Sequence, residues 1–157
     1  MYNSMASSQE AGSQGSTRLH MDMADAINVM LYASNCADGS PGYAVWDLFR
    51  AEDSDKIRDF LRKRLTPHPA AMSKGQQQQE SQTQPEKAFF SIPGITADHD
   101  PIHIQRFYLD VELRRQLWAE YEVKSYRIYQ RPGEGVFIPA GCAHQVRLTY
   151  LTPFYTG

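Results

Sequence analysis

The stretch Thr17-Arg-Leu-His-Met-Asp-Met-Ala-Asp25 decides how the rest of this chain is interpreted, because it places a histidine and an aspartate two positions apart. Its apolar residues are typical of a strand, and side chains at positions i and i+2 of a strand point to the same face. His20 and Asp22 can therefore converge on one point, whereas Asp25, at an odd offset, faces the other way. A lone His-x-Asp pair is a weak signal, so a metal site needs a third ligand from elsewhere in the chain.

The composition is that of a soluble, globular domain of ordinary size. The 157 residues are enough to bury a core, and 41% of them are hydrophobic and 22% charged. The net charge of −2 offers no basic surface to nucleic acid or to an anionic membrane. No apolar run approaches the roughly 18 residues of a membrane span, and the polar N-terminus is not a signal peptide. Cys36 and Cys142 lie far apart, which favours a reducing compartment over disulfides or a zinc site.

The first half of the chain predicts strands followed by a helix. The segment 1–15 is polar and leads into the strand that contains His20. Residues 26–33 form a nearly continuous apolar run that predicts a buried strand, and residues 43–50 predict another. Apolar residues then recur at helical spacing after Asp53 or Ser54, either of which can cap the helix.

The second half of the chain begins with a low-complexity insertion and ends in β structure. Residues 66–87 are rich in proline and glutamine, which is typical of an insertion without a packed core. Asp110 can cap a second helix with an apolar stripe that includes Trp118. Short strands are predicted at 125–130, 135–138 and 143–151, separated by turn sequences. The pattern predicts a mainly β, α+β fold: an antiparallel barrel decorated by two helices.

Several conspicuous residues have structural interpretations. His99 and His103 flank Asp100 like a metal pair, but Pro101 between them argues against a helix, and we favour a structural turn. Trp46 and Trp118 fit core faces better than an aromatic cage, which needs several convergent rings.

Five segments in order resemble the JmjC (Jumonji C) domain, in particular the hairless-like histone lysine demethylases. They are residues 17–25, 44–53, 55–58, 98–103 and 137–146, the last of which contains His144. The resemblance implies a partial double-stranded β-helix, or cupin-like jelly roll, over residues 16–146 with the insertion 66–87. It stops after Val146, and residues 147–157 form an atypical tail.

The resemblance implies that His20, Asp22 and His144 bind Fe(II), with ligand atoms expected within about 3–4 Å of one another. It also implies that Thr17 and Asn28 contact the co-substrate 2-oxoglutarate. The offset of three between Thr17 and His20 allows this only if the strand bends or starts late. Asn28 has the equally open interpretation of a satisfied buried amide.

The implied function is an Fe(II)- and 2-oxoglutarate-dependent dioxygenase that demethylates lysine in the tail of histone H3, in the nucleus. Two alternatives remain open: a catalytically silent fragment acting as a chromatin-associated binding module, and a protein hydroxylase. The lysine that many relatives place near position 37 to pair the co-substrate is absent, and the resemblance lacks early strands and the strand after Val146. We therefore expect weak metal binding and little turnover from this chain.

Overall fold

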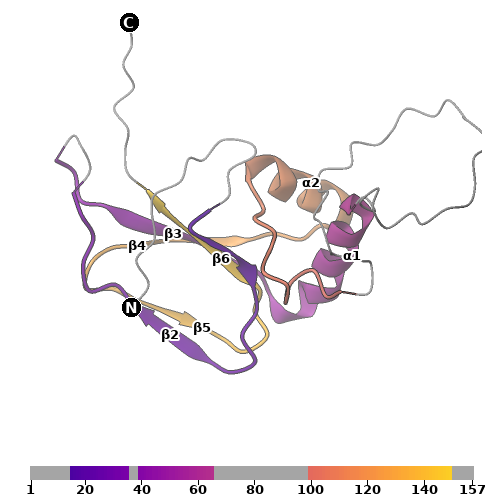
Figure 1. Cartoon of the computed structure of the whole chain (residues 1–157), viewed down its shortest axis with the longest axis horizontal. Helices are drawn as coiled ribbons and strands as arrows, with labels where there is room; N and C mark the ends of the chain where they lie inside the picture. The colour runs from indigo at the N-terminus through magenta and orange to yellow at the C-terminus, as the bar shows by residue number, and fades with distance from the viewer. Residues whose placement is uncertain (1–14, 36–38, 66–98, 150–157) are drawn as a thin grey trace, which may run out of the picture.

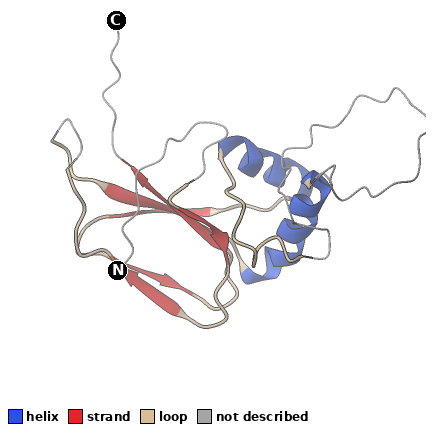
Figure 2. Ribbon diagram, in the orientation of Figure 1, coloured by secondary structure: helices blue, strands red, loops and turns tan. Residues whose placement is uncertain are grey.

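A computed structural model describes residues 15–35, 39–65 and 99–149 of this chain. Within these ranges the chain forms two antiparallel sheets and two helices, which confirms the predicted α+β class (Figures 1 and 2). The predictions for the N-terminal segment 1–14, the insertion 66–87 and the end of the tail lie outside the described residues. No helix in the described ranges is long and apolar enough to cross a membrane.

The larger sheet has four strands in the order β1-β6-β3-β4, and every neighbouring pair is antiparallel. Its strands are β1 (Thr17–His20), β3 (Tyr43–Leu48), β4 (Tyr126–Gln130) and β6 (His144–Thr149). The smaller sheet pairs β2 (Ala26–Val29) with β5 (Gly135–Ile138). The turn between β4 and β5 therefore carries the chain from one sheet to the other, and the two strands do not pair with each other.

One face of the four-stranded sheet, which we call the inner face, packs against β2 and β5. Alternation along β3 places Ala44, Trp46 and Leu48 on this face, as predicted, and all three are buried. The same cluster includes Val136 and Ile138 from the smaller sheet. The inner face therefore closes one of the two hydrophobic cores of the described residues.

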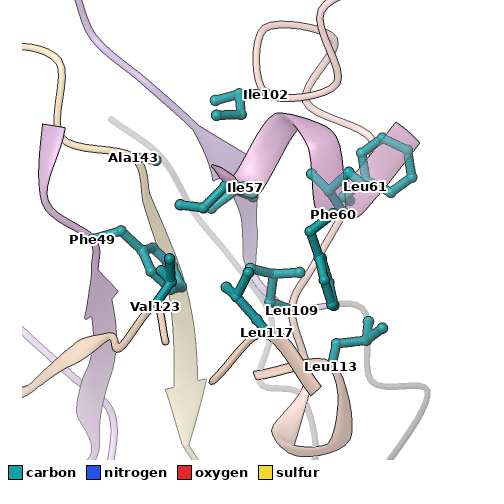
Figure 3. Close-up of a cluster of buried hydrophobic side chains, with 12 residues drawn as sticks. Phe49, Ile57, Phe60, Leu61, Ile102, Leu109, Leu113, Leu117, Val123 and Ala143 are labelled. Carbon is teal, nitrogen blue, oxygen red and sulfur yellow. The ribbon is translucent and has the colours of Figure 1, made fainter. Parts of the chain in front are cut away.

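α1 (Ser54–Arg64) and α2 (Val111–Tyr121) lie together beside one end of the sheet (Figure 1), and Arg114 of α2 contacts Asp47 on the opposite face, which we call the helix face. Phe49, which leaves the end of β3, packs among the buried side chains of these helices (Figure 3). The other members of this core include Ile57, Phe60, Leu61, Leu113 and Leu117. Apolar residues recur at every third or fourth position along each helix, so each helix buries a single apolar stripe in this core.

The helix starts agree with the sequence, although only one forms the expected cap. Asp110 caps α2, because its Oδ1 accepts a hydrogen bond from the backbone N–H of Leu113 at 2.9 Å. A short 3₁₀ turn, η1 (Ala51–Asp53), precedes α1. Asp53 occupies the cap position of α1 without a capping bond, since its carboxylate pairs with Lys56.

Two burial predictions are wrong. The run 26–33 was expected to be buried, but β2 ends at Val29, and Ile27 and Leu31 are 69% and 81% exposed. The outer face of the smaller sheet has no packing partner among the described residues, so apolar side chains remain on its surface. Trp118 is 54% exposed, because it lies at the edge of the stripe that α2 buries.

Candidate metal centre

Three side chains meet at the end of the inner face where β1 finishes and β6 begins. His20 and His144 are opposite each other in the β1–β6 pair, and Asp22 follows two residues after His20. One ligand atom from each of the three lies within 4.8 Å of the others. This separation is somewhat wider than the expected 3–4 Å. Asp22 has room to adjust, because its side chain is 46% exposed.

Backbone carbonyls set the orientation of both imidazoles. Nδ1 of His20 lies 2.8 Å from the carbonyl oxygen of Arg18, and Nδ1 of His144 lies 3.0 Å from that of Cys142. A carbonyl oxygen can only accept, so each Nδ1 must carry the hydrogen. In a neutral ring this leaves the Nε2 lone pair available, which is the usual arrangement for a histidine that binds a metal.

Burial also favours the neutral form of His144, which is 3% exposed. It lowers the pKa of this imidazole, and the charge of nearby His20 acts in the same direction, against opposing effects from the Cys142 carbonyl and Asp22. The Nε2 of His144 lies 3.9 Å from Oδ2 of Asp22. Two imidazoles beside one carboxylate form a donor set that fits a divalent transition metal.

The loop before His144 is tied to the segment that carries Asp22. The backbone N–H of Gly141 donates to the carbonyl oxygen of Asp22 at 2.9 Å, and that of Ala140 donates to Oδ1 of Asp25 at 2.7 Å. Asp25 does not belong to the group of three ligand atoms, as its odd offset indicated. Its carboxylate instead connects the two segments that carry the candidate ligands, a role that the sequence pattern did not reveal.

A register shift in β1 places Thr17 on the inner face. Thr17 pairs with Val146 and His20 pairs with His144, so three steps along β1 match two steps along β6. Val146 and His144 share a face, and residues opposite each other in a sheet point to the same side. Thr17 is therefore on the same side as His20 despite the odd offset, and its side chain is exposed.

Asn28 is on the side of the smaller sheet that faces the inner face, but it is not a buried amide. It pairs with the buried Val136, whereas its neighbours Ile27 and Val29 point outward. The residue is exposed, and its Oδ1 lies 3.2 Å from Nε2 of Gln130. The interpretation of Asn28 as a satisfied buried amide is therefore wrong.

The segment around His99 and His103 forms a turn that packs against α1. Oδ1 of Asp100 accepts hydrogen bonds from the backbone N–H groups of Ile102 and His103, and its Oδ2 pairs with Arg58 at 2.8 Å. Burial alone would raise the pKa of Asp100, but hydrogen bonds from His103, Ile102 and Arg58 outweigh it and lower the pKa to about 2. These contacts agree with a structural role.

Sequence reasoning missed the partners of His144 on the inner face. The Trp46 ring is stacked near the His144 ring, with centroids 6.0 Å apart, and its indole N–H donates to Oε1 of Gln130. Alternation in β3 could have placed Trp46 beside the metal centre. Nothing in the local pattern marks Gln130, which precedes an exposed turn, as a buried residue.

Comparisons with known proteins bear on this arrangement. Residues 84–152 match the family described as "JmjC domain, hydroxylase". The chain is 35% identical to Lysine-specific demethylase 3 of Drosophila melanogaster, over 94% of this chain and 18% of that protein. It is 34% identical to the human Lysine-specific demethylase 3A, over 87% of this chain and 11% of that protein.

A plant relative aligns over a shorter part of the chain. Lysine-specific demethylase JMJ29 of Arabidopsis thaliana is 38% identical over 68% of this chain and 10% of that protein. The chain therefore spans less than a fifth of the length of each of these three relatives.

Proposed function

Because this chain belongs to the JmjC domain family, we propose that it is an Fe(II)- and 2-oxoglutarate-dependent oxygenase domain of the lysine demethylase type. The observation that carries the proposal is the meeting of His20, Asp22 and His144, with both Nδ1 atoms committed to backbone carbonyls. Two imidazoles and one carboxylate on one face suit Fe(II) and leave coordination positions for other ligands.

Iron and 2-oxoglutarate, when bound, would use O₂ to oxidise a C–H bond: one oxygen atom would go to the oxidised carbon and the other to the succinate that forms as 2-oxoglutarate loses CO₂. The chain itself would hold and orient these groups. His20 and His144 would present their Nε2 lone pairs, and Asp22 would provide the only negative charge among the ligands. The buried Trp46 beside His144 would limit the access of water to that ligand.

Thr17 and Asn28 are the proposed contacts for 2-oxoglutarate. Their positions on the two surfaces that face each other support this assignment, since the co-substrate must lie next to the metal. A hydroxyl and an amide can both donate to its oxygen atoms.

The proposed substrate is a methylated lysine in a histone, with the H3 tail as the specific target and the nucleus as the location. The support is the name shared by the relatives, lysine-specific demethylase. Oxidation of an N-methyl group yields a product that releases formaldehyde, whereas oxidation of a carbon side chain leaves a stable alcohol.

The test is a turnover assay on the purified chain with Fe(II), 2-oxoglutarate and methylated H3 peptides. We expect succinate and formaldehyde in equal amounts, at the low turnover that the sequence indicates, and neither product from Asp22→Ala. Asp55→Ala is the matched control, because this carboxylate is 96% exposed and outside the ligand group. Succinate without formaldehyde would favour the protein hydroxylase, and metal binding without succinate would favour the silent binding module.

A further inference from the structure

Gln130 joins the two sheets through its side-chain amide. This residue ends β4 in the larger sheet and is 1% exposed. Its Oε1 accepts from the indole N–H of Trp46 at 2.8 Å. Its Nε2 donates to the smaller sheet, to the backbone oxygen of Asn28 at 3.0 Å and its side-chain Oδ1 at 3.2 Å. A third acceptor is the backbone oxygen of Glu134 at 3.0 Å, in the turn that follows.

The indole of Trp46 decides which way the Gln130 amide faces. An indole N–H is a donor only, so the atom of Gln130 that it meets must be the carbonyl oxygen. The NH₂ group of Gln130 is thereby directed to three oxygen acceptors. The reverse orientation would leave a buried indole N–H facing another donor, which is costly without a partner.

The Gln130 amide in turn decides which way Asn28 faces. Nε2 of Gln130 can only donate, so the atom of Asn28 next to it must be Oδ1. The NH₂ group of Asn28 then points away from Gln130, and no described residue accepts a hydrogen bond from it. Asn28 is exposed and on the side that faces the inner face.

We infer that Gln130 is a positioning residue: anchored by Trp46, it holds the Asn28 amide with its NH₂ group available to donate to a carboxylate. That the carboxylate is that of 2-oxoglutarate rests on the proposed function, whereas the orientation of the two amides does not. A carboxylate is an acceptor-only group, so it is stabilised by the NH₂ side of an amide and repelled by the carbonyl side.

The orientation can be measured directly by NMR on the full chain. Trp46 and Trp118 are the only tryptophans, and they are 4% and 54% exposed, so each serves as a reference for the other. We expect the Trp46 indole hydrogen to exchange slowly with solvent, and a through-hydrogen-bond coupling from Gln130 Nε2–H to the side-chain carbonyl carbon of Asn28. In Gln130→Leu the Trp46 hydrogen should exchange faster, with Trp118 unchanged.

The consequence for binding is measured by titrating 2-oxoglutarate in the presence of Mn(II), which replaces Fe(II) without oxidation. Gln130→Leu should weaken 2-oxoglutarate binding by about 10–100-fold, as is typical when the support of a ligand-binding group is removed. Mn(II) binding measured alone should change far less, since the three proposed ligands remain.

Gln130→Glu separates orientation from general packing. One carboxylate oxygen can still accept from Trp46, so slow exchange of its indole hydrogen should persist. The other oxygen would face three acceptors, the backbone oxygens of Asn28 and Glu134 and Oδ1 of Asn28. Of these groups only the Asn28 amide can rotate, and its rotation turns its carbonyl toward the ligand. We expect this folded variant to lose 2-oxoglutarate affinity as Gln130→Leu does.

The outcomes are distinguishable. Equal exchange of the Trp46 hydrogen in wild type and Gln130→Leu, or absence of the coupling to Asn28, would overturn the positioning role. Unchanged 2-oxoglutarate affinity in both Gln130 variants would also overturn it. If the wild-type chain binds no 2-oxoglutarate with Mn(II), the proposed function fails instead, and the NMR coupling still decides the orientation.

Discussion

On the helix face of the four-stranded sheet, Asp47 is 1% exposed and its two carboxylate oxygens are surrounded by donors. Arg114 and Arg127 pair with it at 2.9 Å, and Gln145 donates to it at 3.2 Å. On the inner face, only one residue away in the same strand, Trp46 lies beside His144. There the hydrogen bonds of His20 and His144 within the described ranges are made at Nδ1, not at Nε2.

The difference indicates that the helix face of the sheet contributes to stability and the inner face to the candidate function. Around Asp47 the side chains satisfy one another, so removing its carboxylate leaves Arg114 and Arg127 without their shared anion. On the inner face, carbonyls occupy the Nδ1 atoms of His20 and His144 but leave each Nε2 available. We therefore expect changes on the helix face to act on folding and changes on the inner face to act on ligand binding.

The largest effect should come from Asp47→Asn, which leaves two arginines without their anion. We expect the free energy of unfolding to fall by about 3–5 kcal/mol, as is typical when a buried ion pair loses one member. Urea denaturation measures it. Asp59→Asn is the control, because its pair with Lys63 is about half exposed and an exposed ion pair contributes little to stability. Equal losses of unfolding free energy in the two variants would contradict the expected difference between the buried and the exposed ion pair.

Asp22→Ala should act on the inner face alone. The only anionic donor is lost, so we expect Mn(II) or anaerobic Fe(II) affinity to fall by about 100-fold or more, beyond the usual cost of a supporting residue. The denaturation midpoint without metal should hardly change, because the side chain is 46% exposed. Asp25→Ala should weaken the metal site less, through the lost bond to Ala140. The assignment is wrong if Asp25→Ala is the more damaging.

Arg147→Met tests a side chain on the helix face whose polar atoms are not satisfied by their neighbours. Arg147 pairs with Val45 in the sheet and is 3% exposed, yet its Nε and Nη2 are buried and have no hydrogen-bond partner in the part of the chain that the structure describes. An unsatisfied buried group costs about 1–3 kcal/mol, so we expect the variant to gain stability by a similar amount. A destabilised variant would show that Arg147 contributes more by charge and packing than it loses by burial.

The smallest effect concerns pH and Asp100, in the turn against α1. Its folded pKa of about 2 lies below its ordinary value near 3.8, so the ionised carboxylate stabilises the fold above that value. This stability is lost as the pH falls from about 4 to about 2. Asp100→Asn should be less stable than wild type at pH 5, with the two midpoints converging near pH 2. Asp55→Asn, whose carboxylate is 96% exposed, should show no such convergence.

The sequence predicted the fold class and the helix positions because these depend on local periodicity and caps. Asp110 capping α2 and the alternation of Ala44, Trp46 and Leu48 are examples. The exposure of Ile27 was not predictable in this way, because an apolar run does not reveal whether anything packs on its outer side.

The residues of the candidate site likewise fall into those that local sequence patterns predict and those that they do not. His20 and Asp22 follow from strand alternation, whereas His144 entered through resemblance to a family. The register shift that brings Thr17 to the inner face, and the contact of Gln130 with Trp46, depend on strands far apart in sequence. Such tertiary contacts leave no mark in a local pattern.

The position of β6 between β1 and β3 has a consequence for the order of folding during synthesis. β1 is made early, but the strand that it pairs with in the described sheet begins 124 residues after His20. At ribosomal rates of about 5–20 residues per second, His20 waits roughly 6–25 seconds for His144. The candidate metal centre can therefore form only late in synthesis. An ion that binds His20 and Asp22 of the nascent chain earlier would lack His144 as its third ligand.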